Sequence, residues 1–276
     1  ASGDESKFKK YWPADVHLVG KEIVRFHTII WPAMLMALGE ELPKQVFGHG
    51  WLIIDGGKMS KSKGNVIDPK ILVEKYGLDS IRYFLLREVP FGADGNFSEE
   101  SLVARINADL ANDLGNLVSR TVTMIEKYFD GSVPAAAETG DFDEDLKTTV
   151  QGTHGRVEEL MDRFQFSSAL SEIWKAISRC NKYIDETMPW VLGRDERRKG
   201  RLATVLYNLA EGIRIISVLI RPFMPGTPGK IWKQMGIPEG EMTNWDSAAE
   251  WGLLAAGTRV KRGEPLFPRI DTVKRG

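Results

Sequence analysis

The chain has 276 residues, of which 42% are hydrophobic and 27% are charged, and its formal net charge at pH 7 is −1. This composition is ordinary for a globular chain with one large or two modest domains, and any nucleic-acid binding has to depend on local patches of charge. The longest apolar stretches, such as residues 213–220, are interrupted by Arg214 and Arg221 well short of the ~20 residues that a membrane helix needs, so we expect no membrane span.

Cysteine usage and the first residues bear on the cellular setting. The single cysteine, Cys180, permits neither an internal disulfide nor a metal site with several cysteine ligands, which fits a reducing, cytoplasmic setting. Residues 1–10 are polar and lysine-rich, and no apolar stretch follows them, so they are not typical of a secretory signal. They also lack an initiating Met, and we therefore expect the chain to start inside a longer protein.

The first 95 residues mix short apolar runs with helical patterns, as α/β domains do. Residues 16–20 form an apolar run that ends in glycine, and they predict a strand. The strand leads into a predicted helix over residues 21–38, where apolar residues recur at helical spacing. These apolar residues are Ile23, Phe26, Ile30, Met34 and Leu38.

A lysine-rich loop follows the next strand. Residues 46–54 predict a second extended segment, which opens into a turn at Asp55-Gly56-Gly57. Residues 58–65 then place three lysines among small polar residues, next to glycines that could act as hinges. Taken alone, such a loop is most often a solvated turn; the alternative is a cationic loop that closes over a ligand.

From Ser98 onward the pattern is helical. Ser98 is a candidate N-cap, and the apolar spacing predicts one helix of about 30 residues that ends near Gly131. An acidic connector follows. Amphipathic helices joined by short loops then imply an antiparallel bundle, and beyond residue 237 the chain is loop-like, with one candidate hairpin. The predicted helices cover residues 146–164, 167–186, 196–221 and 227–236, and the hairpin covers residues 257–270.

The lysine loop carries a family resemblance. Residues 57–65, which include Lys58-Met59-Ser60-Lys61-Ser62, resemble the KMSKS signature of class I aminoacyl-tRNA synthetases. Residues 19–27 and 31–35 are similar to the corresponding stretch of methionyl-tRNA synthetases. The likeness continues through residues 114–117 to Met188-Pro189-Trp190, and it covers roughly residues 10–236.

The resemblance implies a fold and a function. The fold is an α/β partial nucleotide-binding (Rossmann-like) domain followed by an all-α helical bundle, in a predominantly helical chain. We expect the second half of the catalytic domain in residues 1–95, an anticodon-binding bundle in residues 96–236 and a C-terminal extension in residues 237–276. The implied function is that of a methionine–tRNA ligase, which activates methionine with ATP and transfers it to tRNA.

The lysines suit this chemistry. Activation expels pyrophosphate from ATP, so negative charge builds up on the departing oxygens, and a loop that closes ammonium groups over them stabilises the transition state. Lysine is a mobile point charge, whereas arginine favours a fixed bidentate grip. By the resemblance, Lys61 is the main catalytic cation and contacts ATP, and Lys58 is its helper. Mg²⁺ is expected to accompany the nucleotide.

The end of the first predicted strand is the expected nucleotide site. Open α/β sheets bind nucleotides outside the carboxyl ends of their strands, where Gly20 lets a ribose approach and Glu22 can accept hydrogen bonds from its hydroxyls. An acidic residue such as Glu22 is equally typical of the first turn of a helix, where the helix dipole stabilises its charge. The family usually has Asp at this position, so Glu22 is a conservative departure. Lys21 adjoins the same site, and His49, just before the lysine loop, is a further candidate for nucleotide contact.

One face of the first predicted helix is the expected methionine site. Ile23, His27 and Trp31 are spaced by four residues, which places them on one helix face. A histidine on such a face is often bonded to a backbone group instead of a ligand. By the resemblance this face lines the methionine side-chain pocket, where apolar and aromatic walls hold a thioether, with Trp31 as a neighbour of the two others.

A second site is expected in the bundle. Asn112, Asn116 and Arg120 are spaced by four and lie away from the apolar stripe of the long helix. A solvated helix face without a binding role has the same pattern. Trp190 follows Pro189 at a break between helices, where it is either a core residue or a platform for a base. By the resemblance, Asn116, Arg120 and Trp190 read the CAU anticodon of methionine tRNA, and Pro189 shapes the turn.

Much of the synthetase pattern is missing from the chain. No histidine lies in a His-x-Gly-His arrangement, and the inserted zinc-binding domain of the family is absent, so we expect no zinc site and propose that an N-terminal half is a partner. We then expect the isolated chain to be inactive. The alternatives are a non-catalytic tRNA-binding module, the trans subunit of a split enzyme, or a leucine, isoleucine, valine or cysteine synthetase, all of which share the lysine loop.

Overall fold

A computed structural model describes residues 5–54, 57–58 and 67–271 of the chain. Lys61 lies outside the described residues, and Lys58 is described by its backbone alone. Contacts divide the chain into two compact units. The first contains Ala1–Val66 and Val89–Ser98, and the second contains Ile67–Glu88 and Glu99–Gly276.

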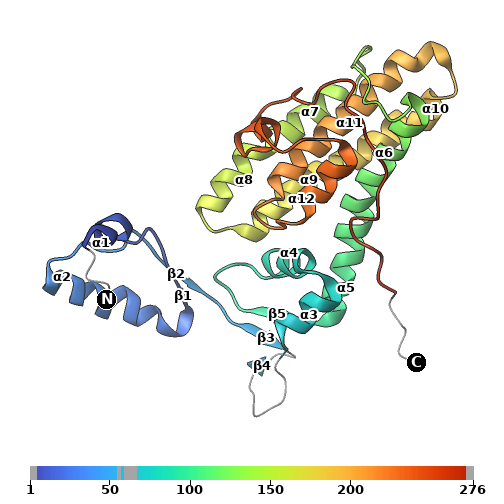
Figure 1. Ribbon diagram of the computed structural model, residues 1–276. Helices are drawn as coiled ribbons and strands as arrows, with labels where there is room; N and C mark the ends of the chain where they lie inside the picture. Colours follow the sequence, from blue (N-terminus) through green and yellow to red (C-terminus); the bar gives the residue numbers. More distant parts are fainter. Residues whose placement is uncertain (1–4, 55–56, 59–66, 272–276) are drawn as a thin grey trace, which may run out of the picture. The chain divides into compact units, whose positions relative to one another are not determined.

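The first unit contains the predicted strand–helix–strand arrangement (Figure 1). Strand β1 (His17–Gly20) pairs in parallel with β2 (Val46–His49), and the register places Gly20 opposite His49. Between them runs a helical segment with a 3₁₀ start, a π turn and an α-helical end, which is where the apolar spacing predicts a helix. A short helix, α1, precedes β1. The helical elements are α1 (Glu5–Tyr11), η1 (Lys21–Ile23), η2 (Phe26–Ile30) and α2 (Trp31–Leu38).

The predicted extended segment 46–54 is two strands in two different sheets, so the prediction of one segment is wrong. After β2 the chain passes Gly50-Trp51 and enters β3 (Leu52–Ile54), which pairs antiparallel with β4 (Gly57–Lys58) and parallel with β5 (Gly95–Phe97). The interruption falls at Gly50, where a Cβ atom would lie 2.0 Å from the carbonyl oxygen of Ala93. The close approach of this segment therefore requires glycine.

The first unit exposes apolar side chains on its helical segment. Phe26, Ile29, Met34, Met36 and Leu38 are each more than half exposed in the described part of the chain, with Leu38 at 70%. Leu35 is the buried residue of α2. An apolar surface of this kind is typical of a protein–protein or domain interface.

The second unit is built around one long helix and a bundle. The long helix is continuous from α5 (Glu99–Arg105) through a π segment, η4 (Ile106–Gly115), to α6 (Asn116–Phe129), which confirms the predicted helix. It ends at Asp130, which adopts the left-handed conformation (φ 49°), and Gly131 follows with φ 72°. Such a pair of residues terminates a helix because its backbone cannot continue the right-handed turn.

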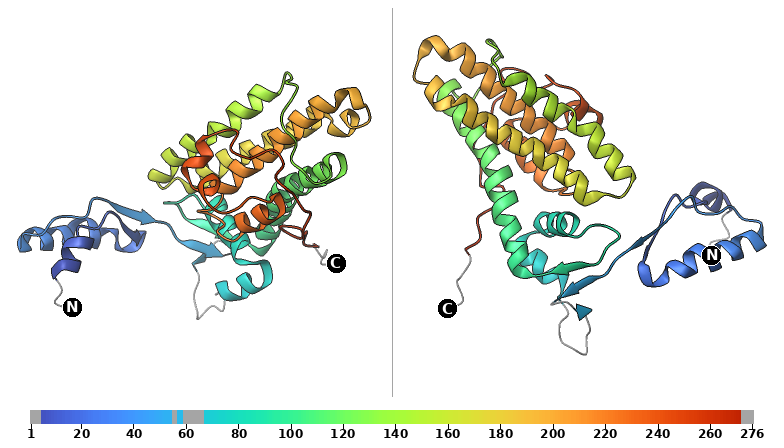
Figure 2. Two further views of the ribbon diagram at one scale, coloured as in Figure 1. Left: turned by 45° about the horizontal axis from the view of Figure 1, so that its top comes forward. Right: turned by 180° about the vertical axis from the view of Figure 1, so that it is seen from behind.

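The remaining helices of this unit include four that lie side by side, α7, α8, α9 and α11 (Figure 2). The predicted helix over residues 146–164 is two helices that break at Gly152, so that prediction is wrong in detail. The helices are α3 (Pro69–Tyr76), α4 (Leu78–Glu88), α7 (Asp143–Gln151), α8 (Thr153–Asp162), α9 (Phe166–Thr187), α10 (Pro189–Leu192), η5 (Glu196–Arg198), α11 (Lys199–Leu219), α12 (Thr227–Met235), η6 (Glu241–Thr243) and η7 (Asp246–Ala249).

Helix α11 forms the centre of the bundle. In the described part of the chain, Glu196–Leu219 is the helix that is long and apolar enough to span a membrane, yet 94% of its apolar window is buried inside the protein. It packs against α6, α7, α9 and α12. Burial on all sides explains why its sequence is apolar all round, as expected for a core helix.

A buried ion pair on α11 holds the C-terminal loops. Glu211 and Arg214 are fully buried, and Nη2 of Arg214 lies 2.8 Å from Oε1 of Glu211. Arg214 also donates hydrogen bonds to the carbonyl oxygens of Met242, Ser247 and Glu250. The carboxylate of Glu211 accepts hydrogen bonds from three successive backbone N–H groups, those of Gly252, Leu253 and Leu254. Each charge is therefore compensated by its partner and by backbone groups.

The candidate hairpin at residues 257–270 is wrong. The segment pairs with the connector after the long helix and not with itself: Val133 donates its backbone N–H to Thr258, and Val260 donates to Gly131. The strap formed by residues 262–270 is then held by side chains. The amide of Asn107 both donates to and accepts from the backbone of Ile270 at 2.9 and 2.8 Å.

Candidate functional site

The carboxyl ends of β1 and β2 bring together the predicted nucleotide residues. Gly20 and His49 are opposite each other in the register, and Lys21 and Glu22 follow in η1. The Nδ1 atom of His49 lies 2.9 Å from the carbonyl oxygen of Gly50. The structure thus gathers at one sheet edge four residues that the sequence placed in one site.

Two residues that sequence analysis missed bind the charged pair at this edge. The indole Nε1–H of Trp51 donates to Oε2 of Glu22 at 2.8 Å. Lys21 donates to both carboxylate oxygens of Asp94 at 2.6 Å. The hydrogen bond from Lys21, followed by that from the backbone N–H of Trp51, lowers the pKa of Asp94. No local motif marks Trp51 or Asp94, because the residues that they contact are distant in the sequence.

Two of the predicted methionine residues, His27 and Trp31, belong to an aromatic cluster. The Nδ1 atom of His27 lies 3.0 Å from the carbonyl oxygen of Ile23, the backbone bond that such a histidine often makes. The ring of His17 meets that of His27 edge-on, with centroids 6.0 Å apart, and Trp12 meets Trp31 in the same way at 6.1 Å. The pocket role of Ile23, His27 and Trp31 stays a prediction.

Asn116 and Arg120 lie one turn apart on α6, and Arg120 faces Trp190. The guanidinium carbon of Arg120 is 6.0 Å from the centroid of the Trp190 ring, and its Nη2 atom is 3.4 Å from a carboxylate oxygen of Asp185. Trp190 is 39% exposed. The ring is therefore no core residue, and an exposed indole next to a guanidinium can stack on a base.

The turn that presents Trp190 is set by its neighbours. Met188 adopts φ 45°, an unusual conformation for a residue with a side chain, and Pro189 occupies the first position of α10 and is buried. Met188 and Val191 are 46% and 37% exposed. Three neighbouring apolar side chains thus face solvent at the α9–α10 junction, which suits contact with the faces of bases.

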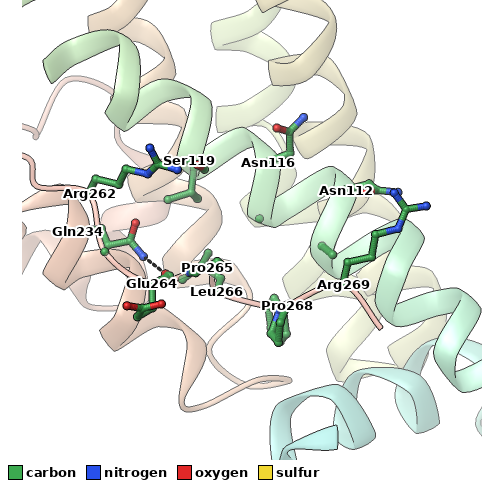
Figure 3. Close-up of a pocket in the computed structure, with 15 residues that line it drawn as sticks. Asn112, Asn116, Ser119, Gln234, Arg262, Glu264, Pro265, Leu266, Pro268 and Arg269 are labelled. Atoms are coloured by element: carbon green, nitrogen blue, oxygen red, sulfur yellow. Dashed lines mark hydrogen bonds between the residues drawn. The ribbon is translucent and has the colours of Figure 1, made fainter. Parts of the chain in front are cut away.

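Asn116 also lines a pocket of about 560 Å³ between the long helix and the strap (Figure 3). Asn112 and Ser119 come from the helix side, and Arg262 and Arg269 come from the strap. Gln234 of α12 donates a hydrogen bond of 3.0 Å to the carbonyl oxygen of Glu264 and thereby fixes the strap. Sequence analysis missed the strap residues because it assigned them to a hairpin.

Most of the charges that follow α10 are used within the protein. Arg197 pairs with Asp195 at 3.0 Å, and Lys199 lies 3.4 Å from Glu196. Arg201 forms a largely buried pair with Asp143 at 2.7 Å. Arg201 is therefore held within the bundle by a neighbouring carboxylate.

Within residues 5–54, 57–58 and 67–271, no group of three His, Cys, Asp or Glu side chains is placed to hold a metal ion. Cys180 is buried, and burial raises the pKa of its thiol to about 12. The thiol is therefore protonated at neutral pH, a poor state for a metal ligand.

Comparison with known proteins agrees with this architecture. Residues 1–122 match the family model described as tRNA synthetases class I (M), which gives the class of this protein. Residues 133–275 match the anticodon binding domain of methionyl tRNA ligase. The chain belongs to the methionyl-tRNA ligase family of class I aminoacyl-tRNA synthetases.

Individual relatives cover nearly the whole chain. A methionine–tRNA ligase of Caldanaerobacter subterraneus subsp. tengcongensis is 70% identical over 98% of the chain, and one of Halalkalibacterium halodurans is 58% identical over 98%. The chain spans 42% and 41% of their lengths. The methionyl-tRNA synthetase of Mycobacterium tuberculosis in complex with methionyl-adenylate is 44% identical, with a TM-score of 0.91, over 97% of this chain and 52% of that chain.

Proposed function

We propose that the chain is the part of a methionine–tRNA ligase that holds the KMSKS loop and the anticodon-binding bundle. The complete synthetase, in which an N-terminal catalytic half precedes this chain, joins methionine to tRNA-Met with ATP and Mg²⁺ in the cytoplasm. The observation that carries the proposal is the exposed Trp190 beside Arg120, on a bundle that matches an anticodon binding domain. We retain the domain boundaries 1–95, 96–236 and 237–276 as part of the proposal.

The residues of the first unit receive the roles that the resemblance implies. Gly20, Lys21, Glu22 and His49 form the nucleotide edge, and their common position at the ends of β1 and β2 supports this role. Lys61 and Lys58 supply charge to the departing pyrophosphate. Ile23, His27 and Trp31 contact the methionine side chain.

The exposed apolar face of the first unit supports an N-terminal partner half. Phe26, Ile29 and Met34 are more than half exposed, and burying such side chains contributes roughly 1.5–3 kcal/mol each. The relatives are more than twice as long as this chain, so they contain residues that could cover this face. The given residues contain no His-x-Gly-His segment, and in this proposal the N-terminal half supplies it.

A pyrophosphate-exchange assay tests the proposal. The complete synthetase should exchange pyrophosphate into ATP when methionine is present and not when leucine, isoleucine, valine or cysteine replaces it. The isolated chain should show no exchange. Methionine-dependent exchange that appears on mixing the chain with a separate N-terminal half would favour the split enzyme, and a complete protein without any exchange would favour a tRNA-binding module.

Replacing Trp190 by alanine should weaken binding of a CAU stem-loop to the chain by roughly 10- to 100-fold, because stacking on an aromatic side chain contributes about 1–3 kcal/mol per base. Asn116→Ala should also weaken binding through lost hydrogen bonds. Fluorescence anisotropy with a labelled stem-loop measures both. Phe142→Ala is the matched control, since Phe142 is 40% exposed and is not one of the residues proposed to contact the anticodon. An equal affinity for all variants would contradict the assignment.

A further inference from the structure

Trp51 contacts both charged residues that follow Gly20. Its indole Nε1–H donates a 2.8 Å hydrogen bond to Oε2 of Glu22, and the ammonium group of Lys21 lies 4.2 Å from the centroid of its ring. The edge of an aromatic ring is positive and its face is negative, so one side chain attracts an anion by its edge and a cation by its face. Trp51 therefore restrains both Lys21 and Glu22.

Asp94 attaches Trp51 and Lys21 to the start of β5. Its carboxylate accepts 2.6 Å hydrogen bonds from Lys21 and a 2.8 Å hydrogen bond from the backbone N–H of Trp51. The backbone N–H of Gly95 in turn donates to the carbonyl oxygen of Trp51 at 2.9 Å. The backbone of Trp51, whose indole holds Glu22, is thus hydrogen-bonded through both its N–H and its carbonyl group.

Glycine permits these close approaches. A Cβ atom on Gly20 would lie 2.6 Å from Oε2 of Glu22, and one on Gly50 would lie 2.0 Å from the carbonyl oxygen of Ala93. Either distance is shorter than real Cβ contacts. A side chain at Gly20 would displace the Glu22 carboxylate, and one at Gly50 would push the segment with Asp94 away from Trp51.

We propose that Trp51 and Asp94 are positioning residues of the nucleotide site, which hold the Glu22 carboxylate in the orientation that selects ribose over deoxyribose. This inference rests on the proposed function, in which Glu22 accepts hydrogen bonds from the ribose hydroxyls. A carboxylate has about four acceptor positions. The indole N–H uses one of them and restricts rotation of the group, so a hydroxyl finds it already oriented and little entropy is lost on binding.

The test compares Trp51→Phe with the wild type in the complete synthetase, in methionine-dependent exchange with ATP, 2′-deoxy-ATP and 3′-deoxy-ATP. Phenylalanine keeps a ring face for Lys21 and removes the N–H that orients Glu22. The wild type should prefer ATP over at least one analogue in kcat/KM, and Trp51→Phe should reduce that preference by about 5- to 10-fold. Asp94→Asn should reduce it in the same direction, because it loosens Lys21 and the Trp51 backbone.

Trp245→Phe provides the matched control. The Trp245 indole donates a 2.9 Å hydrogen bond to Glu158 in the second unit, so this change removes an equivalent bond elsewhere and should leave the ATP preference unaltered. A merely structural role for Trp51 would reduce the use of ATP and of both analogues equally.

The possible failures are distinct. A wild-type enzyme that exchanges with methionine but does not discriminate between ATP and either analogue would overturn the inference, as would a Trp51→Phe enzyme that keeps the full preference. A wild-type enzyme without methionine-dependent exchange would instead remove the proposed function itself.

Discussion

Replacing Arg214 by methionine should lower the free energy of unfolding of the chain by about 3–5 kcal/mol, because it leaves the fully buried Glu211 carboxylate without its ionic partner. The change also removes the donors that hold Met242, Ser247 and Glu250. Urea denaturation, followed by circular dichroism at 222 nm, measures the loss. Arg214→Lys should lower the free energy of unfolding by less, since lysine keeps the positive charge but lacks the several N–H donors of the guanidinium group.

An exposed ion pair is the control for this prediction. Arg163 lies 2.7 Å from Glu159 one turn away, and both side chains are more than 60% exposed. Arg163→Met should change the free energy of unfolding by no more than about 1 kcal/mol, because water and salt screen such pairs. Equal losses for Arg163→Met and Arg214→Met would mean that the buried pair does not hold the C-terminal loops.

Lys61→Ala should lower kcat for methionine-dependent pyrophosphate exchange in the complete synthetase by about 10²–10³-fold, the usual cost of removing one group that stabilises transition-state charge. The KM for methionine should change little, because the amino acid is held by other residues. Lys58→Ala should have a smaller effect in the same direction.

A lysine on the bundle provides the comparison for this series. Lys147→Ala removes the same charge from α7 and should leave exchange unchanged. A Lys61→Ala enzyme with wild-type kcat would show that the lysine loop is a solvated turn, which is the other interpretation of this sequence.

Local patterns predicted most of the secondary structure, because apolar spacing reports which face of a helix or strand is buried. The long helix from Glu99 to Phe129 and the strand that ends at Gly20 follow from such patterns. The candidate hairpin at residues 257–270 failed for a non-local reason. Its backbone bonds go to Gly131 and Val133, more than a hundred residues earlier, and no periodicity within the segment reveals that partner.

The residues of the candidate sites also divide into those that local sequence patterns indicate and those that only long-range contacts reveal. The common position of Gly20, Glu22 and His49 could be predicted because each ends or follows a strand of one parallel pair. Their role in nucleotide binding stays a prediction. Asp94 could not, since it lies 43 residues from Trp51 and 73 from Lys21 and belongs to no motif. In the bundle, the sequence left open whether Trp190 is a core residue or a platform for a base. Its exposure excludes a core residue, and its role as a platform stays a prediction.

The anticodon preference of the wild-type chain tests most directly whether the bundle recognises the CAU anticodon. Stem-loops that carry CAU or a single-base variant of it can be titrated against the chain at one fixed salt concentration, because phosphate contacts make affinity salt-dependent. The CAU stem-loop should bind more tightly than each variant by about 10-fold or more, as expected for a mismatch cost of about 1–3 kcal/mol. Indistinguishable affinities for all of the stem-loops would contradict this prediction.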